Sequence, residues 1–290
     1  MQNKVLTIRT QSGEKRAQFS TSLARGLAVL AAFSPDRPLL GITTLAALLE
    51  MDKSTTHRYV ATLEELGYLE QDSESQKYRL GIKVVDLGLA ALNAMEMRHI
   101  ARPHMERLAR ESGHTINIGI LDGADVFYVE RVTNPTSIDL NLTVGSRLPA
   151  YCTSMGKVLL ADLPEERLFD LIDRVEFLPR GPNTIITRGA LLAELQRVRV
   201  AGFAVNNEEL AYGHRSISAP IRSRAGATIA ALNMAVRASM ISLDDLTGWL
   251  ASHLISVADH ISSYLGYRPE SGTRNMMPAG NAKGIVASDQ

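Results

Sequence analysis

Cysteine is almost absent from this chain of 290 residues, which contains only Cys152. A single cysteine cannot form an intramolecular disulfide, and it cannot supply the several thiolates of a structural zinc site. Long apolar runs are missing too. No stretch approaches the roughly 18 apolar residues of a membrane helix, and the N-terminus is polar where a signal peptide needs an apolar core. We therefore expect a cytoplasmic protein that does not enter a membrane.

Net charge is also missing, because 31 Lys and Arg balance 31 Asp and Glu. The chain lacks the basic character that would by itself indicate nucleic-acid binding, so any DNA contact must come from local placement of charge. The strongest local excess of positive charge lies in residues 1–25, where Glu14 is the only acidic residue and the basic residues are Lys4, Arg9, Lys15, Arg16 and Arg25. Such an arm suits phosphate or minor-groove contact, but its polar composition predicts that residues 1–18 are a disordered N-terminal arm.

Two short helices with a turn between them are predicted within residues 40–67. Leu45, Leu48 and Leu49 recur at helical spacing, and the residues just before Lys53 can turn the chain into the next helix. The first turns of that second helix are crowded with hydrogen-bond donors and small side chains. Because a recognition helix reads bases with its N-terminal residues, this order is typical of a helix-turn-helix.

A further helix and a wing complete the predicted DNA-binding domain, residues 19–82. Leucines at spacings of four and three in residues 22–33 indicate a helix that packs under the other two. After Gly67, residues 68–70 and 77–80 predict paired strands around a polar tip. We expect DNA contacts from Lys53, Ser54, Thr55, Thr56, His57, Arg58, Arg25, Lys77 and Arg79. The same helical pattern also occurs in protein-interaction modules, and the pattern alone leaves that reading open.

The rest of the chain predicts a second domain of the α+β class. Residues 83–98 carry apolar positions on more than one stripe and predict a linker helix. Residues 99–268 alternate helical patterns with strand-like hairpins, including a strand at 138–142, which is typical of α+β domains. Residues 269–290 are rich in Gly, Asn, Ala and Ser and predict a disordered tail.

Several sequence blocks resemble the IclR family of bacterial transcriptional regulators, in the same order and spacing. They are residues 23–30, 53–67, 78–81, 156–161, 202–209 and 216–221. The resemblance implies a winged helix-turn-helix joined by a linker helix to a GAF-like effector domain. Residues 148–156 look most similar to the branch that regulates aromatic-acid catabolism, including protocatechuate, p-hydroxybenzoate and β-ketoadipate pathway genes. The chain departs from the family at Met51, where many members have a glycine in the turn.

The resemblance also implies where a small effector binds: at the start of one helix, in the loop before the penultimate strand, and on the last two strands. The residues at those positions are Ser154, Met155, Asn206, His214, Ser216 and Asn233. Helix N–H groups, hydroxyls and amides suit a small organic acid, and a cation among His214, Arg215 and Arg147 is expected to hold its carboxylate. Taken singly, each residue has a structural reading, such as a helix cap for Ser154.

An enzyme is the alternative class of function. Ser154 and Lys157 match the S-x-x-K pattern of penicillin-recognising serine hydrolases, but the companion Ser-Asp-Asn and Lys-Thr-Gly motifs do not occur in the chain. Cys152 and His214 are a second nucleophile and base that the sequence would allow. Neither pair is supported by further residues, so we expect no catalytic activity.

We expect no metal site and no cofactor. His99, His104 and His114 are spaced by five and ten residues, so they do not stack on one helical face as an i, i+4 pair would. Gly156 and Lys157 do not form a phosphate-binding loop, because the glycine and the Ser or Thr of a Walker motif are missing around them.

Together these patterns predict a ligand-responsive transcription factor that binds a double-stranded DNA operator. One recognition helix covers too few base pairs for useful specificity, so a homodimer or a tetramer is expected. In this interpretation an acid metabolite favours one arrangement of the subunits and so changes the spacing of two recognition helices. The linker helix is where we expect subunits to touch.

Overall fold

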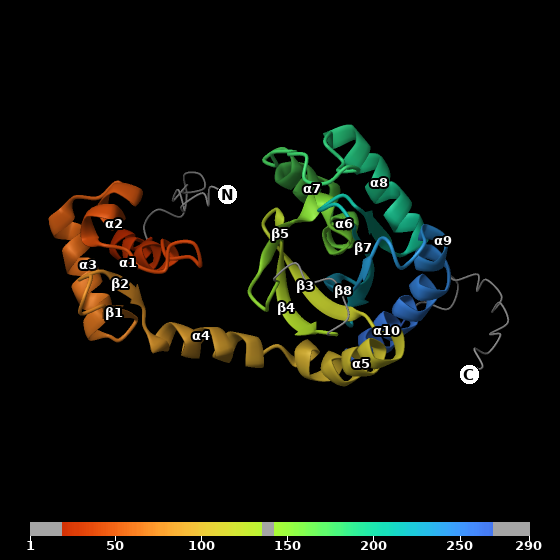
Figure 1. Ribbon diagram of the computed structural model, residues 1–290, viewed down its shortest axis with the longest axis horizontal. Helices are drawn as coiled ribbons and strands as arrows, with labels where there is room; N and C mark the ends of the chain where they lie inside the picture. The colour runs from red at the N-terminus through yellow and green to blue at the C-terminus, as the bar shows by residue number, and fades with distance from the viewer. Residues whose placement is uncertain (1–18, 135–141, 269–290) are drawn as a thin grey trace, which may run out of the picture. The chain divides into compact units, whose positions relative to one another are not determined.

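The structure, a computed structural model, describes residues 19–134 and 142–268 (Figure 1). The arm predicted at residues 1–18, the tail predicted at 269–290 and nearly all of the strand predicted at 138–142 lie outside the described residues. Among the helices within the described ranges, none is long and apolar enough to cross a membrane.

The N-terminal compact unit ends at Met95 and carries a helix-turn-helix followed by a hairpin. Its elements are α1 (Thr21–Ala31), α2 (Ile42–Leu48), α3 (Lys53–Glu65), β1 (Leu69–Gln71), β2 (Tyr78–Leu80) and α4 (Ile82–Asn93). One buried core holds the three helices and the hairpin together: Val29, Ala32, Phe33, Leu40, Leu45, Val60, Leu69 and Tyr78. The predicted winged helix-turn-helix is confirmed. The inward face predicted for α1 is not, because Leu23 and Leu27 are 64% and 57% exposed.

The turn before α3 forms without a glycine. Glu50, not Met51, adopts the left-handed backbone with φ +51°, and Met51 instead packs against the core. Asp52 then caps α3, since its Oδ1 accepts the backbone N–H of Thr55 at 2.8 Å. The same hydrogen bond is the main cause that lowers the pKa of Asp52 far below its usual value. At the other end α3 stops before Gly67, whose φ of +77° confirms the predicted termination.

Two helices, rather than one, occupy the predicted linker region. The sequence predicts one helix over residues 83–98, whereas α4 ends at Asn93 and α5 (Glu96–Ser112) begins the C-terminal unit. Pro103 lies inside α5 and does not end it. Met105, two residues further on, is fully buried, so tertiary packing outweighs the hydrogen bond that proline removes from the helix.

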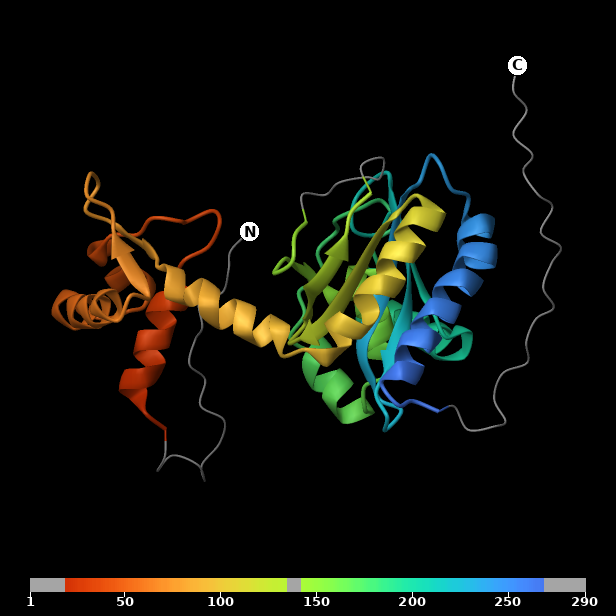
Figure 2. The same ribbon diagram turned by 90° about the horizontal axis from the view of Figure 1, so that it is seen from below.

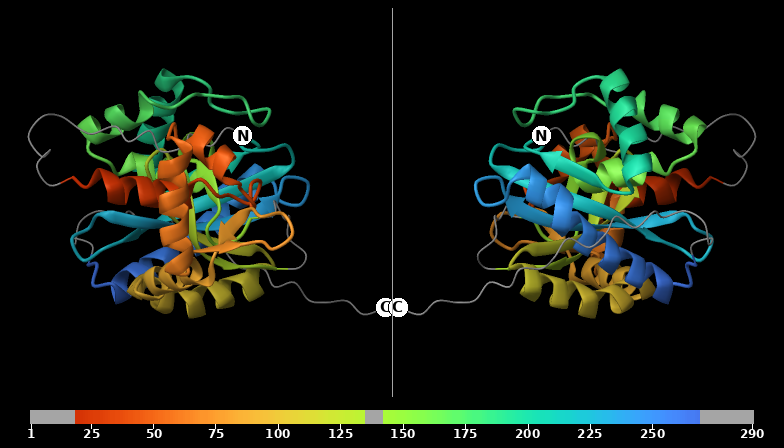
Figure 3. Two further views of the ribbon diagram at one scale, coloured as in Figure 1. Left: turned by 90° about the vertical axis from the view of Figure 1, so that its left-hand side faces the viewer. Right: turned by 90° about the vertical axis from the view of Figure 1, so that its right-hand side faces the viewer.

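The C-terminal unit is built on an antiparallel sheet of order β5-β4-β3-β8-β7-β6. Its strands are β3 (Thr115–Asp122), β4 (Asp125–Val132), β5 (Arg147–Pro149), β6 (Ala204–Asn207), β7 (His214–Arg222) and β8 (Thr228–Arg237). One face is covered by α5 and by α10 (Ala251–Tyr264), which follows α9 (Leu243–Asp245) and the π-helical turn η3 (Leu246–Leu250). The other face carries α6 (Ser154–Ala161), with α7 (Glu165–Ile172) and α8 (Arg188–Ala201) outside it (Figures 2 and 3). The α+β class is confirmed.

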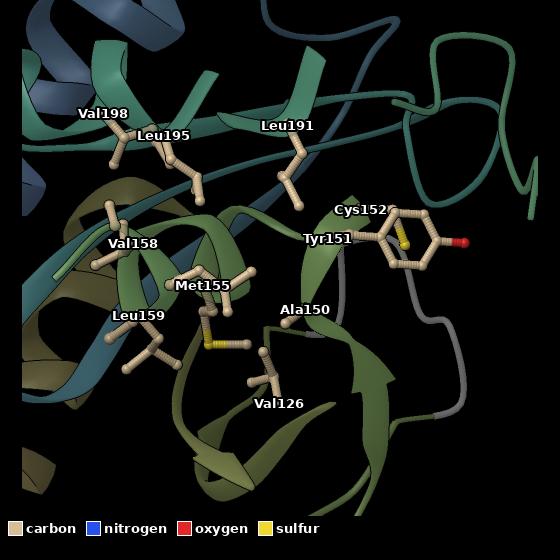
Figure 4. Close-up of a cluster of buried hydrophobic side chains, with 14 of the residues drawn as sticks. Val126, Ala150, Tyr151, Cys152, Met155, Val158, Leu159, Leu191, Leu195 and Val198 are labelled. Carbon is tan, nitrogen blue, oxygen red and sulfur yellow. The ribbon is translucent and has the colours of Figure 1, made fainter. Parts of the chain in front are cut away.

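Helix α6 is the centre of this core, and all of its residues are buried. Its apolar side chains pack against α8 and against the short helix η2 (Ala150–Cys152), as Figure 4 shows. Gly156 permits the close approach to η2, because a Cβ there would lie 2.1 Å from the carbonyl oxygen of Ala150. The start of α6 is thereby held against η2.

Candidate functional site

The first turns of α3 present most of the predicted DNA contacts to solvent. Lys53, Ser54, His57 and Arg58 are exposed, and Thr55 is half-buried. Thr56 differs, because it is fully buried and its Oγ1 donates to the carbonyl oxygen of Asp52 at 2.9 Å. A side chain held in this way cannot reach a base edge. Thr56 therefore stabilises the start of the helix and is a wrong prediction as a contact.

The remaining predicted DNA contacts, Arg25, Lys77 and Arg79, are exposed. Arg79 already has a partner, since its Nε lies 3.1 Å from Oε2 of Glu70, the residue opposite it in the hairpin. This surface ion pair orients the arginine and offsets part of its charge.

All six residues predicted to hold an effector line one cavity between α6 and the sheet. They come from α6 (Ser154, Met155), β6 (Asn206), β7 (His214, Ser216) and β8 (Asn233). Each is less than a tenth exposed. The other described lining residues are Asn117, Tyr128, Arg131, Leu142, Thr153, Leu210 and Ala235. The structure therefore brings together residues that the sequence places far apart.

The cavity is small in this conformation. Its volume is about 20 Å³, which is room for about one water molecule. Part of its lining is apolar and flexible, including Met155 and Leu210. A ligand larger than water must displace such side chains. Methionine is unbranched and flexible, so moving it costs little energy.

A row of polar side chains crosses four strands on the cavity face of the sheet. Arg131 in β4 lies opposite Asn117 in β3, and Asn117 lies opposite Asn233 in β8. Ser218 in β7 continues the row beside Asn233. Hydrogen bonds follow the same path. Nη1 of Arg131 donates to Asn117 at 3.2 Å, Nδ2 of Asn117 donates to Asn233 at 2.8 Å, and Nδ2 of Asn233 donates to the Ser218 hydroxyl at 3.1 Å.

Ser154 connects this row to α6. Its Oγ lies 2.8 Å from the hydroxyl oxygens of Ser216 and Ser218, and Asn233 donates to it at 3.1 Å. The reading of Ser154 as a helix cap is wrong, because Thr153 is the N-cap and accepts a backbone N–H of α6. The Ser154 hydroxyl instead belongs to the polar cluster at the cavity.

His214 enters the cavity as a neutral imidazole. The residue is 5% exposed, and its Nδ1 is buried and makes no hydrogen bond with any described residue. Burial lowers the pKa of His214 to about 4. Of the three cations left open by the sequence, His214 is therefore neutral near pH 7, although the ring can still exchange a hydrogen bond with a ligand.

The other two predicted cations, Arg215 and Arg147, do not line the cavity. Arg215 Nη1 donates to the carbonyl oxygen of Ile241 at 2.8 Å, and Arg147 forms an ion pair with Asp122. The cation that does line the cavity is Arg131, which no sequence pattern singles out. Its neighbours Asn117 and Tyr128 were missed as well.

Lys157 is not positioned to activate Ser154. Its Nζ lies 2.6 Å from a carboxylate oxygen of Glu209 and 3.1 Å from one of Glu194, and its side chain is 1% exposed. Burial raises the pKa of Glu209 by more than Lys157 lowers it. Burial also acts on Glu194, but there Lys157 and Arg197 together keep the pKa below its usual value. A lysine engaged by two carboxylates is no general base, and this geometry disfavours the S-x-x-K hydrolase.

The thiol of Cys152 is equally unsuited to nucleophilic chemistry. Burial raises the pKa of Cys152 to about 12, and its Sγ lies 3.7 Å from the carbonyl oxygen of Pro149. A thiol in this environment stays protonated and unreactive. Within residues 19–134 and 142–268, no group of three or more His, Cys, Asp or Glu could hold a metal ion.

Comparison with known proteins agrees with this division of the chain. Residues 22–73 match the family described as the IclR helix-turn-helix domain. Residues 89–263 match the family described as the bacterial transcriptional regulator IclR C-terminal domain. The two matches coincide with the α3 surface and with the cavity, respectively.

Individual relatives cover most of the chain. The Pca regulon regulatory protein of Pseudomonas putida is 36% identical over 79% of this chain and 78% of its own length. The HTH-type transcriptional regulator XynR of Escherichia coli K12 is 32% identical over 85% of this chain and 97% of its own length. The crystal structure of an IclR homolog from Microbacterium hydrocarbonoxydans, complexed with 4-hydroxybenzoate, has a TM-score of 0.73 at 27% identity and covers 84% of this chain and 99% of that one. This chain belongs to the IclR family of bacterial transcriptional regulators.

Proposed function

We propose that this regulator changes its affinity for operator DNA when a small organic acid binds in the cavity between α6 and the sheet. It acts in the cytoplasm on genes for the catabolism of aromatic or other small organic acids. The observation that carries the proposal is that all six residues assigned to the effector by the family resemblance line one buried cavity. The similarity to a Pca regulon regulator and to a homolog that binds 4-hydroxybenzoate supports the choice of ligand class.

The chemistry of the cavity suits an anion. Hydroxyl and amide donors converge on it from Ser154, Ser216 and Asn233, and the N-terminus of α6 faces the same space. Arg131 adds a positive charge, and no Asp or Glu is among the described lining residues. A carboxylate is therefore attracted, while a cationic ligand would find no carboxylate among the described lining residues.

DNA recognition is assigned to α3 and to its flanks. Lys53, Ser54, His57 and Arg58 project from the first turns of α3 and would meet base edges in the major groove. Arg25, Lys77 and Arg79 would contact phosphates, which orient the protein without reading sequence.

A homodimer, or a tetramer built from dimers, is part of the proposal. No residue of α4 is buried, although Ile82, Val85 and Leu87 are apolar and each is more than half exposed. On α1, Leu23 and Leu27 are exposed in the same way. Apolar helical stripes of this kind are stabilised when a second copy of the chain covers them.

Fluorescence anisotropy on the DNA upstream of the protein's own gene tests the proposal. The full chain is titrated at two salt concentrations, with and without a panel of small aromatic and aliphatic acids. We expect preference over a scrambled duplex and a shift in affinity with at least one acid. An affinity that no acid changes would contradict the effector role, and equal binding to scrambled DNA would contradict the assignment of this operator.

A further inference from the structure

Tyr59 follows the expected DNA contacts of α3 by one position and packs between α3 and α1, two helices that contact each other (Figure 1). Its ring lies against α1, because a Cβ on Gly26 would be 4.0 Å from Cδ1 of Tyr59. The half-buried side chain also packs on the core of the N-terminal unit. A tyrosine side chain has only two χ angles, so a packed ring holds its phenolic oxygen in a nearly fixed place.

Two residues of α1 form hydrogen bonds with this phenolic oxygen. The hydrogen bond with Ser22 is the largest of the causes that lower the pKa of Tyr59 below its usual value, and the hydrogen bond with Arg25 adds to it. Because a guanidinium has no acceptor, Arg25 donates and the phenolic oxygen accepts. Ser22 and Arg25 are three positions apart in α1, so they lie on the same side of that helix.

A second arginine lies near the same ring. Cζ of Arg58 is 6.0 Å from the centroid of the Tyr59 ring, at the outer limit of a cation–π contact. Arg25 and Arg58 are both exposed, one on α1 and the other on α3. Tyr59 therefore gathers one positive charge from each helix, an arrangement that suits the phosphates of DNA.

The hydrogen bond to Tyr59 matters because an arginine side chain in solvent samples many rotamers. Fixing such a side chain on a phosphate costs conformational entropy, and a side chain that is already oriented loses less. Arg25 has five N–H donors, so others remain for phosphate oxygens after one has bonded to Tyr59. Phosphate contacts set the register of a protein on the duplex. One contact held at a fixed distance from α3 therefore helps to place the recognition helix.

We propose that Tyr59 is a positioning residue for DNA binding, and that together with Ser22 it holds the guanidinium of Arg25 against a DNA phosphate. This role rests on the proposed function, in which Arg25 contacts a phosphate. Tyr59 acts through Arg25 and touches no base, so its contribution should not depend on the DNA sequence.

Tyr59→Phe tests the role, because it removes only the phenolic oxygen and keeps the packed ring. Fluorescence anisotropy of the full chain is measured on the DNA upstream of its own gene and on a scrambled duplex. We expect binding to both duplexes to weaken by the same factor, at least about threefold, as for the loss of a hydrogen bond to a charged group. The melting temperature should stay that of wild type. Tyr68→Phe is the matched control, because Tyr68 follows the C-terminal end of α3, and it should bind DNA as wild type does.

A double-mutant cycle identifies the residue through which Tyr59 acts. Arg25→Met keeps an unbranched side chain of good helix propensity and removes the guanidinium. In the Arg25→Met background, Tyr59→Phe should cause no further loss, whereas in the Arg58→Ala background it should cause the same loss as in the wild-type chain. Tyr59→Phe should also make the salt dependence of DNA affinity less steep, because less phosphate charge is neutralised. A residue that only stabilised the fold would leave that dependence unchanged.

Wild-type DNA affinity in Tyr59→Phe would overturn the positioning role, and so would a loss that is equal with and without Arg25. In either case the proposed function stands if Arg58→Ala still weakens binding to the operator. If the wild-type chain binds neither duplex, the proposed DNA recognition is contradicted, and the role of Tyr59 fails with it.

Discussion

Glu130 and Arg131 are adjacent in β4, yet their side chains lie on opposite faces of the sheet. Glu130 forms ion pairs with Arg98 at 2.8 Å and with Arg102 at 3.2 Å, both on α5. Arg131 donates to Asn117 on the face that carries the cavity. Because side chains alternate along a strand, one short segment contacts both the cavity and the helix that follows α4 in the chain. Under the proposed function, a ligand that contacts Arg131 would therefore act close to the ion pairs that anchor α5.

Glu130→Gln should uncouple ligand binding from DNA binding. The Glu130 side chain is 4% exposed and that of Arg98 is 16% exposed, so loss of the charge should lower the free energy of unfolding by about 3 kcal/mol. The ligand should still bind, while its effect on DNA affinity becomes smaller. Urea unfolding and anisotropy measure the two effects. Glu106→Gln breaks only the exposed pair with Arg102 and should cost less than about 1 kcal/mol; an equal loss in both variants would contradict the role of Glu130.

Gly156→Ala should damage the C-terminal unit far more than Gly189→Ala. A Cβ on Gly156 would lie 2.1 Å from the carbonyl oxygen of Ala150, whereas one on Gly189 in α8 meets nothing within 4 Å. We expect the first change to cost at least about 1–3 kcal/mol through overpacking and the second to be neutral or stabilising by up to about 1 kcal/mol. Thermal unfolding compares them. Similar melting temperatures would contradict the close approach of α6 to η2.

His214 should make stability depend on pH in a defined direction. Its pKa falls from 6.5 to about 4 on folding. Between pH 6.5 and about 4 the imidazole of His214 is protonated in the unfolded chain but neutral in the folded chain. The contribution of His214 to the free energy of unfolding is therefore complete above pH 6.5 and is lost as the pH falls toward 4. At about 1.4 kcal/mol per pH unit the loss is about 3 kcal/mol. Urea unfolding of wild type and His214→Phe, measured between pH 7.5 and 4.5, should show their difference changing by nearly this amount. If the difference in free energy of unfolding between the two proteins did not change with pH, the pKa of His214 would be the same in the folded and unfolded chains.

Arg58→Ala should weaken operator binding more than tenfold, or by about 1.4 kcal/mol, since Arg58 is exposed on the first turns of α3. Arg79→Ala should have a smaller effect, because Glu70 already pairs with that guanidinium. Anisotropy on the operator and on a scrambled duplex separates base contact from phosphate contact. A loss at Arg58 that is the same on both duplexes would move this residue to the DNA backbone.

The DNA-binding unit could be predicted from the sequence because most of its signals are local. Gly67 ends α3 where the pattern places it, and the turn before α3 lies where the helical spacing breaks. The inward face of α1 could not be predicted in this way. Leu23 and Leu27 form a helical stripe but are exposed, while Val29 is buried. Spacing shows that a stripe exists, and only tertiary packing decides which stripe meets the core.

The cation of the cavity could not be predicted, because strand register brings it there. Asn117 and Asn233 are 116 positions apart and meet only where β3 pairs with β8. Arg131 joins them through the β3–β4 pairing. No local pattern specifies the pairing of β3 with β8, which are not consecutive strands, so the sequence does not place the β3–β4 hairpin with Asn117 and Arg131 beside Asn233, and the resemblance located Asn233 but not its two partners. The sequence instead favours Arg215 and Arg147 as the cations that hold the carboxylate, since both are basic and close in sequence to predicted site residues.

Ser216→Leu is the sharpest test of the effector cavity, because Ser216 is 3% exposed, lines the cavity and lies 2.8 Å from Ser154. Anisotropy on operator DNA is measured for wild type and for this variant, with and without the acid that shifts the wild-type curve. We expect the variant to bind DNA with wild-type affinity and to lose its response to the acid, since leucine fills the cavity and removes a hydroxyl. A variant that still responds as the wild type does would place the effector site elsewhere in the chain.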